Sequence, residues 1–328
     1  MALDTQLAIA PYDAPLKDLY DIGEMPPLGH VPARMHAWAI RRERHGEPDQ
    51  AMQVEVVEVP EIDSQEVLVL VMAAGVNYNG VWACLGQPVS VFDGHKAPYA
   101  VLGSDAAGIV WQVGDKVKRW KVGDEVVIHC NQDDGDDEEC NGGDPMFSPS
   151  QRIWGYETPD GSFAQFTRVQ SQQLMLRPRH LTWEESACYT LTLATAYRML
   201  FGHKPHELRP GQNVLVWGAS GGLGSYAIQL INTAGANAIG VISEEDKRAF
   251  VMGLGAKGVI NRKNSTAGAR CRRSTRRNMR RGSKRRASSG RRSGRSPARA
   301  TMWTWCLNIR ASRRFRFRSL WPSAVAWW

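Results

Sequence analysis

The clearest chemical pattern in this sequence is a glycine-rich turn, Gly218-x-x-Gly221-Gly222-x-Gly224, between an apolar run at 213–217 and a helical pattern. Glycines let the backbone approach a pyrophosphate without a Cβ in the way, and free amides at a helix start favour negative charge. A glycine-rich stretch alone is often only a tight turn, but strand–turn–helix is the context of a dinucleotide site. We predict that this site is formed by Gly218, Ser220, Gly221, Gly222, Leu223 and Gly224.

The end of the next predicted strand bears on the choice between NAD and NADP. Enzymes that use NAD place an acidic residue there to bind the ribose hydroxyls. This sequence has Ser243, followed by Lys247 and Arg248, and a small hydroxyl with two cations suits a 2′-phosphate. Glu244 and Glu245 argue against NADP, and the two cations could also form a solvated helix face. We predict NADPH.

The cysteines do not suggest a metal site. A catalytic zinc needs three protein ligands, and a structural zinc needs a close cluster of cysteines. Up to residue 263 the cysteines have no close-spaced pair, and Gly103-Ser104-Asp105 occupies the place where a zinc dehydrogenase carries Gly-His-Glu. We therefore predict no zinc. The acidic loop at 131–140 lacks the spacing of a calcium loop and is interpreted as a solvated surface segment.

Two regions with different hydrophobic patterns must fold into the elements that position these residues. From about residue 35 to 173, short apolar runs (67–76, 106–114 and 124–130) are broken by Gly, Pro and Asp, which predicts a strand-rich, barrel-like domain. After residue 177, a helix predicted for 184–200 begins at a capping box, Thr182 with Glu185. Strand patterns at 213–217, 238–243 and 256–262 then alternate with helical ones, which predicts half of a doubly wound nucleotide-binding fold.

Charge divides the chain near Lys263. The first 263 residues hold 22 Lys and Arg against 33 Asp and Glu, whereas the last 65 hold 19 basic residues and no acid. The N-terminus has neither a basic region nor an apolar run long enough for export or membrane insertion. Six cysteines in a chain of this size suggest reduced thiols. We expect a cytoplasmic protein without a membrane partner.

Several stretches of residues 14–263 resemble crotonyl-CoA carboxylase/reductase, a family of the medium-chain dehydrogenase/reductase superfamily. The most specific motifs are Asn77-Tyr78-Asn79 followed by Val81-Trp82, and Ile153-Trp154-Gly155-Tyr156-Glu157. The resemblance implies a mixed α+β and α/β fold. It places an N-terminal extension at 1–34, a GroES-like catalytic domain at 35–180 and the first half of a Rossmann domain at 181–263. It also implies a homo-oligomer, dimeric or tetrameric in full-length members.

The resemblance implies reductive carboxylation of an enoyl-CoA. NADPH reduces the β-carbon of crotonyl-CoA, and the enolate attacks CO2 to give ethylmalonyl-CoA. The family's catalytic roles fall here on Asn79, Tyr156 and Glu157. Asn79 would donate to a CO2 oxygen, as would the backbone amide of Tyr156, and Glu157 would fix a water together with a histidine. From the residues alone, Asn79 could simply cap a turn and Glu157 could be a surface carboxylate.

The resemblance stops at Lys263, and residues 264–328 form an acid-free mixture of Arg, Ser, Gly and Trp that predicts no packed domain. Met and Trp each have a single codon. The segment 302–306, Met-Trp-Thr-Trp-Cys, therefore leaves little freedom in what its bases encode when read in another frame. That frame gives Val-Asp, then Met, Leu or Val, then Val, in the style of the family's VDMVFEHPG. We hypothesise that one base is missing near codon 264 and that the chain as written has no turnover.

Two alternatives stay open. One is a simple NADPH enoyl-CoA reductase, similar to quinone oxidoreductases, that protonates the enolate. The other is an inactive protein whose basic arm binds nucleic acid nonspecifically through counterion release.

Overall fold

The computed structural model describes residues 15–202, 207–264 and 324–326, the last three as backbone only. Two compact units divide between Leu191 and Thr192, eleven residues beyond the boundary predicted from sequence. Residues 324–326 are grouped with the first unit. The frame hypothesis and the basic arm concern residues that, apart from Asn264 and 324–326, lie outside the described parts of the chain. No helix in those parts is long and apolar enough to span a membrane.

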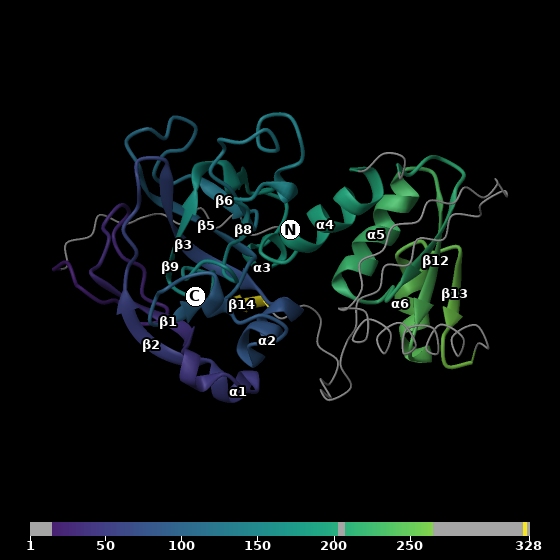
Figure 1. The fold of residues 1–328 in the computed structure, drawn as a ribbon, viewed down its shortest axis with the longest axis horizontal. Coiled ribbons are helices and arrows are strands. Elements are labelled where there is room, and N and C mark those ends of the chain that lie inside the picture. The colour runs from purple at the N-terminus through teal and green to yellow at the C-terminus, as the bar shows by residue number, and fades with distance from the viewer. Residues whose placement is uncertain (1–14, 203–206, 265–323, 327–328) are drawn as a thin grey trace, which may run out of the picture. The chain divides into compact units, whose positions relative to one another are not determined.

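The first unit is built around β3 (Glu66–Gly75), whose last nine residues are all buried. A continuous apolar run of this kind suits a strand that is covered on both faces. β5 (Ala106–Val113) pairs antiparallel with one edge of β3. β9 (Phe166–Gln170) and β14 (Ala324–Ala326) pair antiparallel with the two halves of the other edge. Figure 1 shows β3, β5 and β9 side by side.

The remaining strands of the first unit extend this sheet or form smaller ones. β6 (Glu125–Ile128) and β10 (Leu174–Leu176) continue outward from β5, while β1 (Arg34–Ile40) lies between β2 (Gln53–Glu58) and β4 (Ala100–Val101). β7 (Asn131–Gln132) pairs with β8 (Arg152–Ile153). The helices are α1 (Pro48–Ala51), α2 (Tyr78–Leu85) and α3 (Trp183–Ser186), followed by α4 (Thr190–Phe201), in which the two units divide.

The GroES-like, strand-rich fold predicted for this region is confirmed. Residues 15–33, which the sequence assigned to an extension, include side chains that pack on this unit: Tyr20 is 1% exposed. The indole Nε1 of Trp111 donates to the carbonyl of His30 at 2.7 Å. β14 falls within the stretch for which the sequence predicted no fold. It occupies the part of the β3 edge that β9 leaves, where backbone N–H and C=O groups would otherwise lack partners.

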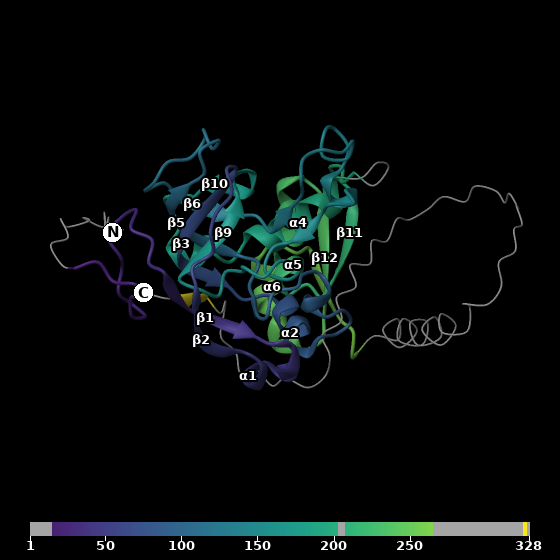
Figure 2. The same cartoon turned by 60° about the vertical axis from the view of Figure 1, so that its left-hand side comes forward.

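The second unit contains β11 (Asn213–Trp217), α5 (Gly222–Thr233), β12 (Asn237–Ile242), α6 (Arg248–Gly253) and β13 (Gly258–Asn261). Its strands are parallel in the order β11-β12-β13. Apolar residues of these strands and of α5 and α6 share one core. The β-α-β-α-β order predicted from sequence is confirmed, and Figure 2 shows α5 beside β12.

Candidate functional site

The Asn77-Tyr78-Asn79 motif lies where β3 ends and α2 begins. Asn77 is the N-cap residue of α2, with extended backbone, but its side chain makes no cap hydrogen bond. Instead its Nδ2 donates to Oδ2 of Asp105 at 2.7 Å. Asn79, in the first turn of the helix, donates from Nδ2 to the hydroxyl oxygen of Ser104 at 3.1 Å. Alternate residues of the motif are therefore held by two consecutive residues of a neighbouring segment.

That segment, Gly103-Ser104-Asp105, connects β4 to β5 and is buried. Ser104 is 1% exposed and Asp105 is fully buried. Gly103 has φ +98°, a conformation that favours glycine. In sequence this segment served only as evidence against zinc. In the structure it is the immediate support of Asn79.

The Asp105 carboxylate accepts three hydrogen bonds. Besides Asn77, the Thr190 hydroxyl and the Leu191 amide, the latter at 2.8 Å, both donate to its Oδ1. These two donors come from the first turn of α4, where a negative group is favoured by the unpaired amides of the helix start. Burial raises the Asp105 pKa to about 6, while the three hydrogen bonds oppose that rise. Asp105 thus links the starts of α2 and α4.

Tyr156 and Glu157 lie in the loop that follows β8. Glu157 Oε2 accepts from the backbone amide of Ile153 at 2.8 Å. The amide of Tyr156 donates to the carbonyl of Ile153 at 3.1 Å, so this amide is engaged within its own loop. The Tyr156 hydroxyl donates to the carbonyl of Val89, in the segment after α2, at 3.2 Å.

The loop of Tyr156 and Glu157 is in backbone contact with the Gly103–Asp105 segment. Gly155 has φ +71°, and a Cβ built on it would overlap the carbonyl oxygen of Gly103. The amide of Ser162 donates to that same oxygen at 2.9 Å. The structure therefore brings both predicted motifs against one segment: Asn79 through Ser104, and the Tyr156 loop through Gly103.

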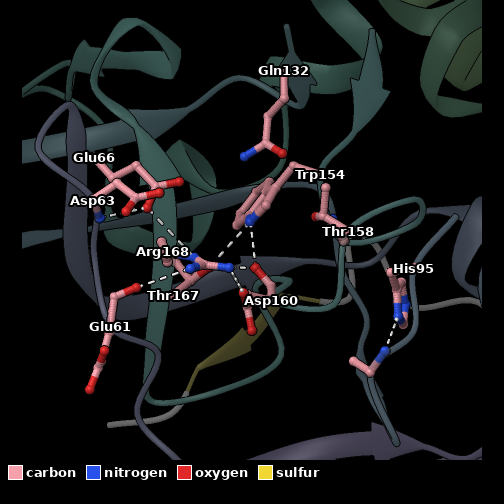
Figure 3. Close-up of polar contacts among 12 residues, drawn as sticks. Glu61, Asp63, Glu66, His95, Gln132, Trp154, Thr158, Asp160, Thr167 and Arg168 are labelled. Atoms are coloured by element: carbon pink, nitrogen blue, oxygen red, sulfur yellow. Dashed lines mark hydrogen bonds and ion pairs between the residues drawn. The ribbon is translucent and has the colours of Figure 1, made fainter. Parts of the chain in front are cut away.

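A polar network fixes the far side of this loop, as Figure 3 shows. The fully buried indole of Trp154 donates to the carbonyl of Asp160 at 2.6 Å. The guanidinium of Arg168 donates to the Asp160 carboxylate at 2.8 Å and forms an ion pair with Glu66 on β3 at 3.7 Å. His95 lies on the other side of Asp160 in this view, and burial lowers its pKa.

The described cysteines are poor zinc ligands. Burial raises the thiol pKa of Cys84 and Cys188 to about 11 and that of Cys130 to about 12. None of these three thiols belongs to a group of described residues with metal-ligand spacing. Among the described residues, the one group with ligand spacing is Asp134, Asp137 and Cys140, in the acidic loop. Its carboxylates accept hydrogen bonds from the loop itself, including the amides of Asp136 and Cys140.

The glycine-rich turn of the second unit has the geometry that the fingerprint predicts. Gly218 has φ +74°, so it makes the turn after β11. A Cβ at Gly224 would overlap the carbonyl oxygen of Gly218, so this glycine lets α5 pack against the turn. A Cβ at Gly221 would have only that oxygen nearby, at 3.4 Å. The surroundings of Gly221 are open, and α5 begins at the next residue with the unpaired amides of a helix N-terminus.

The predicted 2′-phosphate residues have different surroundings. The Arg248 guanidinium pairs with Glu245 and donates to the carbonyl of Val259 at 3.1 Å. Lys247 forms no ion pair with any described residue. Glu244, counted against NADP in the sequence, pairs with Lys263 at 2.6 Å, and this partner lowers the Glu244 pKa. Ser243 is partly buried at the end of β12. Lys247 is therefore better placed than Arg248 to meet a phosphate.

Sequence reasoning missed Asn77, Ser104 and Asp105 as parts of the site. A signal was present: Asp105 directly precedes an apolar strand pattern, and a carboxylate that is buried there needs hydrogen-bond donors. The sequence did not show which donors these would be, because Thr190 and Leu191 lie more than 80 positions away.

A GroES-like domain followed by a parallel nucleotide-binding sheet is the architecture of medium-chain dehydrogenases/reductases. Residues 63–179 match the family model of the alcohol dehydrogenase GroES-like domain. The chain is 88% identical, over 264 residues, to a crotonyl-CoA carboxylase/reductase of Cereibacter sphaeroides; the match covers 80% of the chain and 61% of that protein. A crotonyl-CoA reductase of Streptomyces avermitilis is 43% identical, with 67% of the chain and 52% of that protein covered.

Solved structures agree with these relatives. A crotonyl-CoA carboxylase/reductase structure matches with a TM-score of 0.74 and 76% identity, covering 76% of this chain and 58% of its own. AntE, a crotonyl-CoA carboxylase/reductase solved with NADP, matches with a TM-score of 0.72 and 49% identity, covering 75% and 62%. The chain belongs to the crotonyl-CoA carboxylase/reductase family, and it spans about half to three fifths of the length of the curated relatives it matches.

Proposed function

We propose that this protein carries the catalytic and nucleotide-binding parts of an NADPH-dependent enoyl-CoA carboxylase/reductase, with crotonyl-CoA as substrate and ethylmalonyl-CoA as product. The observation that carries the proposal is the support of Asn79: its amide is bound to a buried serine on the segment that also contacts the Tyr156 loop. A site for weakly bound CO2 needs donors held in place before CO2 arrives, because CO2 is neutral and offers only weak acceptors.

Each predicted residue has a task in this proposal. Asn79 uses one Nδ2 hydrogen for Ser104, and the other is the donor to a CO2 oxygen. The amide of Tyr156 is the second donor, which requires it to share or exchange its bond to Ile153. Glu157 holds a water through Oε1, since its Oε2 is bound to Ile153. We propose that the histidine that would share this water belongs to the sequence that the restored frame encodes after residue 263.

The second unit would bind NADPH, which supplies the hydride for the β-carbon. Gly218 and Gly221 leave room at the start of α5 for the pyrophosphate. The amides of Ser220, Gly222, Leu223 and Gly224 would face it. Ser243 and Lys247 would hold the 2′-phosphate. A relative named for reductive carboxylation, CinF, has been solved with NADP and 2-octenoyl-CoA and is 39% identical, with a TM-score of 0.68.

The competing outcome is protonation of the enolate, which would give butyryl-CoA and make the protein a simple enoyl-CoA reductase. The hydrogen bond of Asn79 to Ser104 and the backbone contact of the Tyr156 loop with Gly103 favour carboxylation, because protonation of the enolate needs no oriented amide. We also propose that zinc takes no part, since Gly103-Ser104-Asp105 stands where a zinc dehydrogenase carries Gly-His-Glu.

The wider proposals follow the family. They are a cytoplasmic homo-oligomer with an enoyl-CoA substrate and no membrane partner, a catalytic domain up to about residue 180, and a nucleotide-binding half-domain from 181 to 263. For residues 264–328 we propose an out-of-frame translation. On that basis the chain as written lacks turnover, and restoring one base near codon 264 restores it.

The test compares the chain as written with the frame-restored chain, each given NADPH, crotonyl-CoA and CO2, with products separated by chromatography. We expect ethylmalonyl-CoA from the frame-restored chain and no NADPH oxidation from the chain as written. Asn79→Ala in the frame-restored chain should lower the carboxylated fraction about tenfold, since it removes a pre-oriented donor. Asn141→Ala, in the exposed acidic loop, is the matched control and should leave that fraction unchanged.

The other outcomes decide between the alternatives. Butyryl-CoA as the sole product of the frame-restored chain would make it a simple reductase. NADPH oxidation with crotonyl-CoA by the chain as written would reject the out-of-frame proposal.

A further inference from the structure

We infer that Ser104 and Asp105 are positioning residues for the Asn79 amide: Ser104 orients the amide, and Asp105 fixes the helix start that carries it. The inference rests on the proposed function for its consequence, CO2 binding. It rests on the structure for its geometry.

Ser104 sets the orientation of Asn79. A side-chain amide has a donor end and an acceptor end, and rotation by half a turn exchanges them. The Ser104 hydroxyl oxygen accepts from Nδ2 of Asn79 at 3.1 Å and is itself almost fully buried. The bond holds the Asn79 amide against Ser104, with Nδ2 on the Ser104 side. Without the hydroxyl, the amide could rotate and present its oxygen to CO2, which would repel it.

Asp105 sets the place of the helix start. Asn77 is bonded to Asp105 through its side chain, so the backbone entering α2 is fixed two residues before Asn79. The carboxylate is held in turn by Thr190 and Leu191, so it cannot follow a shift of Asn77 without losing those donors. A fully buried carboxylate with three partners is a rigid support.

The two supports act on alternate residues of one helical turn. Consecutive residues of the Gly103–Asp105 segment bind Asn79 and Asn77, so neither rotation of the Asn79 side chain nor displacement of its backbone is free. The two bonds together hold the Asn79 amide and the backbone that carries it in one place.

The primary experiment uses the chain as it stands, labelled with ¹⁵N-asparagine, and follows the side-chain NH2 resonances of Asn79, identified by their loss in Asn79→Ala. Ser104→Ala should move these resonances by more than their linewidth. Ser162→Ala is the matched control: Ser162 is a fully buried neighbour whose hydroxyl has no hydrogen-bond partner among the described residues. It should leave the Asn79 resonances in place.

The second part of the experiment tests Asp105 by exchanging the side chains at positions 77 and 105. N77D alone places two carboxylates together and should displace the Asn79 resonances. N77D/D105N restores a donor and an acceptor between the two positions, and it leaves an amide oxygen for Thr190 and Leu191. We expect it to return the resonances toward their wild-type positions, a rescue that does not depend on the Ser104 variant folding well.

Dissolved CO2 supplies the functional readout, because it can be titrated against the Asn79 resonances without turnover. Ser104→Ala should weaken the apparent CO2 affinity about fivefold, the value of one ordinary hydrogen bond. Asn79 resonances that CO2 does not shift in the frame-restored chain would reject the proposed function. Asn79 resonances identical in Ser104→Ala and wild type, or a folded N77D/D105N protein without rescue, would overturn the inference itself.

Discussion

Buried polar residues, more than exposed ones, organise the first unit of this protein. Asp105 has no exposed surface, yet it joins the starts of α2 and α4, which are far apart in sequence. Burial penalises its ionised form, so the residue is retained at a cost in stability that its three donors only partly offset.

This cost predicts a pH dependence of stability. The Asp105 pKa is raised from 3.8 in the unfolded chain to about 6 in the fold. The folded state therefore binds a proton more readily, and the stability that protonation gives is present below pH 4 and is lost as pH rises through 6. The loss is about 3 kcal/mol. Urea unfolding from pH 4 to 7 should show it as a falling difference between wild type and Asp105→Asn.

Titration of the other carboxyls is common to both proteins and cancels in that difference. A difference that stays flat from pH 4 to 7 would show that Asp105 is not a titrating buried acid.

We expect that no side chain is tolerated at position 155. Gly155→Ala combines a positive φ with overlap of the new Cβ and the Gly103 carbonyl oxygen, so we expect a loss of more than about 3 kcal/mol in the free energy of unfolding. Gly135→Ala is the matched control, because Gly135 has φ +74° and open space around its Cβ position. It should lose only about 1–2 kcal/mol. Equal losses in urea unfolding would mean that the two loops separate easily.

At the scale of elements, the sequence predicted most strands of both units. The patterns at 67–76, 106–114 and 213–217 correspond to β3, β5 and β11. They could be predicted because a long apolar run must be buried. The single helix predicted for 184–200 was wrong in one respect. It is divided into α3 and α4, because Asp105 takes up the first donors of α4 and fixes a new helix start at Thr190. That cause is tertiary, so local periodicity could not reveal it.

The end of β12 yields a prediction about cofactor choice. Lys247→Ala should weaken NADPH binding about tenfold and leave NADH binding unchanged, because it removes a cation from the 2′-phosphate. Arg248→Ala should change NADPH affinity less than threefold but lower the free energy of unfolding by about 1 kcal/mol, since it loses its bond to the Val259 carbonyl. Nucleotide fluorescence titration and urea unfolding measure the two effects. A larger affinity loss in Arg248→Ala would reverse the assignment.

At the scale of the whole molecule, the fold class, the proposed catalytic residues and their supports depend on three different kinds of evidence. The fold class followed from apolar patterning and the glycine turn. The proposed catalytic residues Asn79, Tyr156 and Glu157 followed only from resemblance, because single polar residues carry little signal alone. Their supports, Ser104 and Asp105, needed the tertiary structure, since hydrogen bonds between distant segments leave no periodic trace in the sequence.

The charge of residues 264–328 predicts binding to polyanions by the chain as written. Nineteen basic residues and no acid should bind RNA or heparin without sequence preference, with affinity that falls steeply as salt increases. A chain ending at residue 263, which has a net negative charge, is the control and should not bind. Electrophoretic mobility shifts at two salt concentrations measure this, and salt-independent binding would contradict a counterion-release mechanism.

The close contact between Gly103 and Gly155 also limits how this loop can be engineered. A library that randomises residues 154–160 would contain mostly unfolded members if Gly155 were varied, and Trp154 is nearly as restricted by its buried indole. Tyr156 is only partly buried against the core, and its hydroxyl reaches a single backbone carbonyl, so substitution there should cost less folded protein than at Trp154 or Gly155.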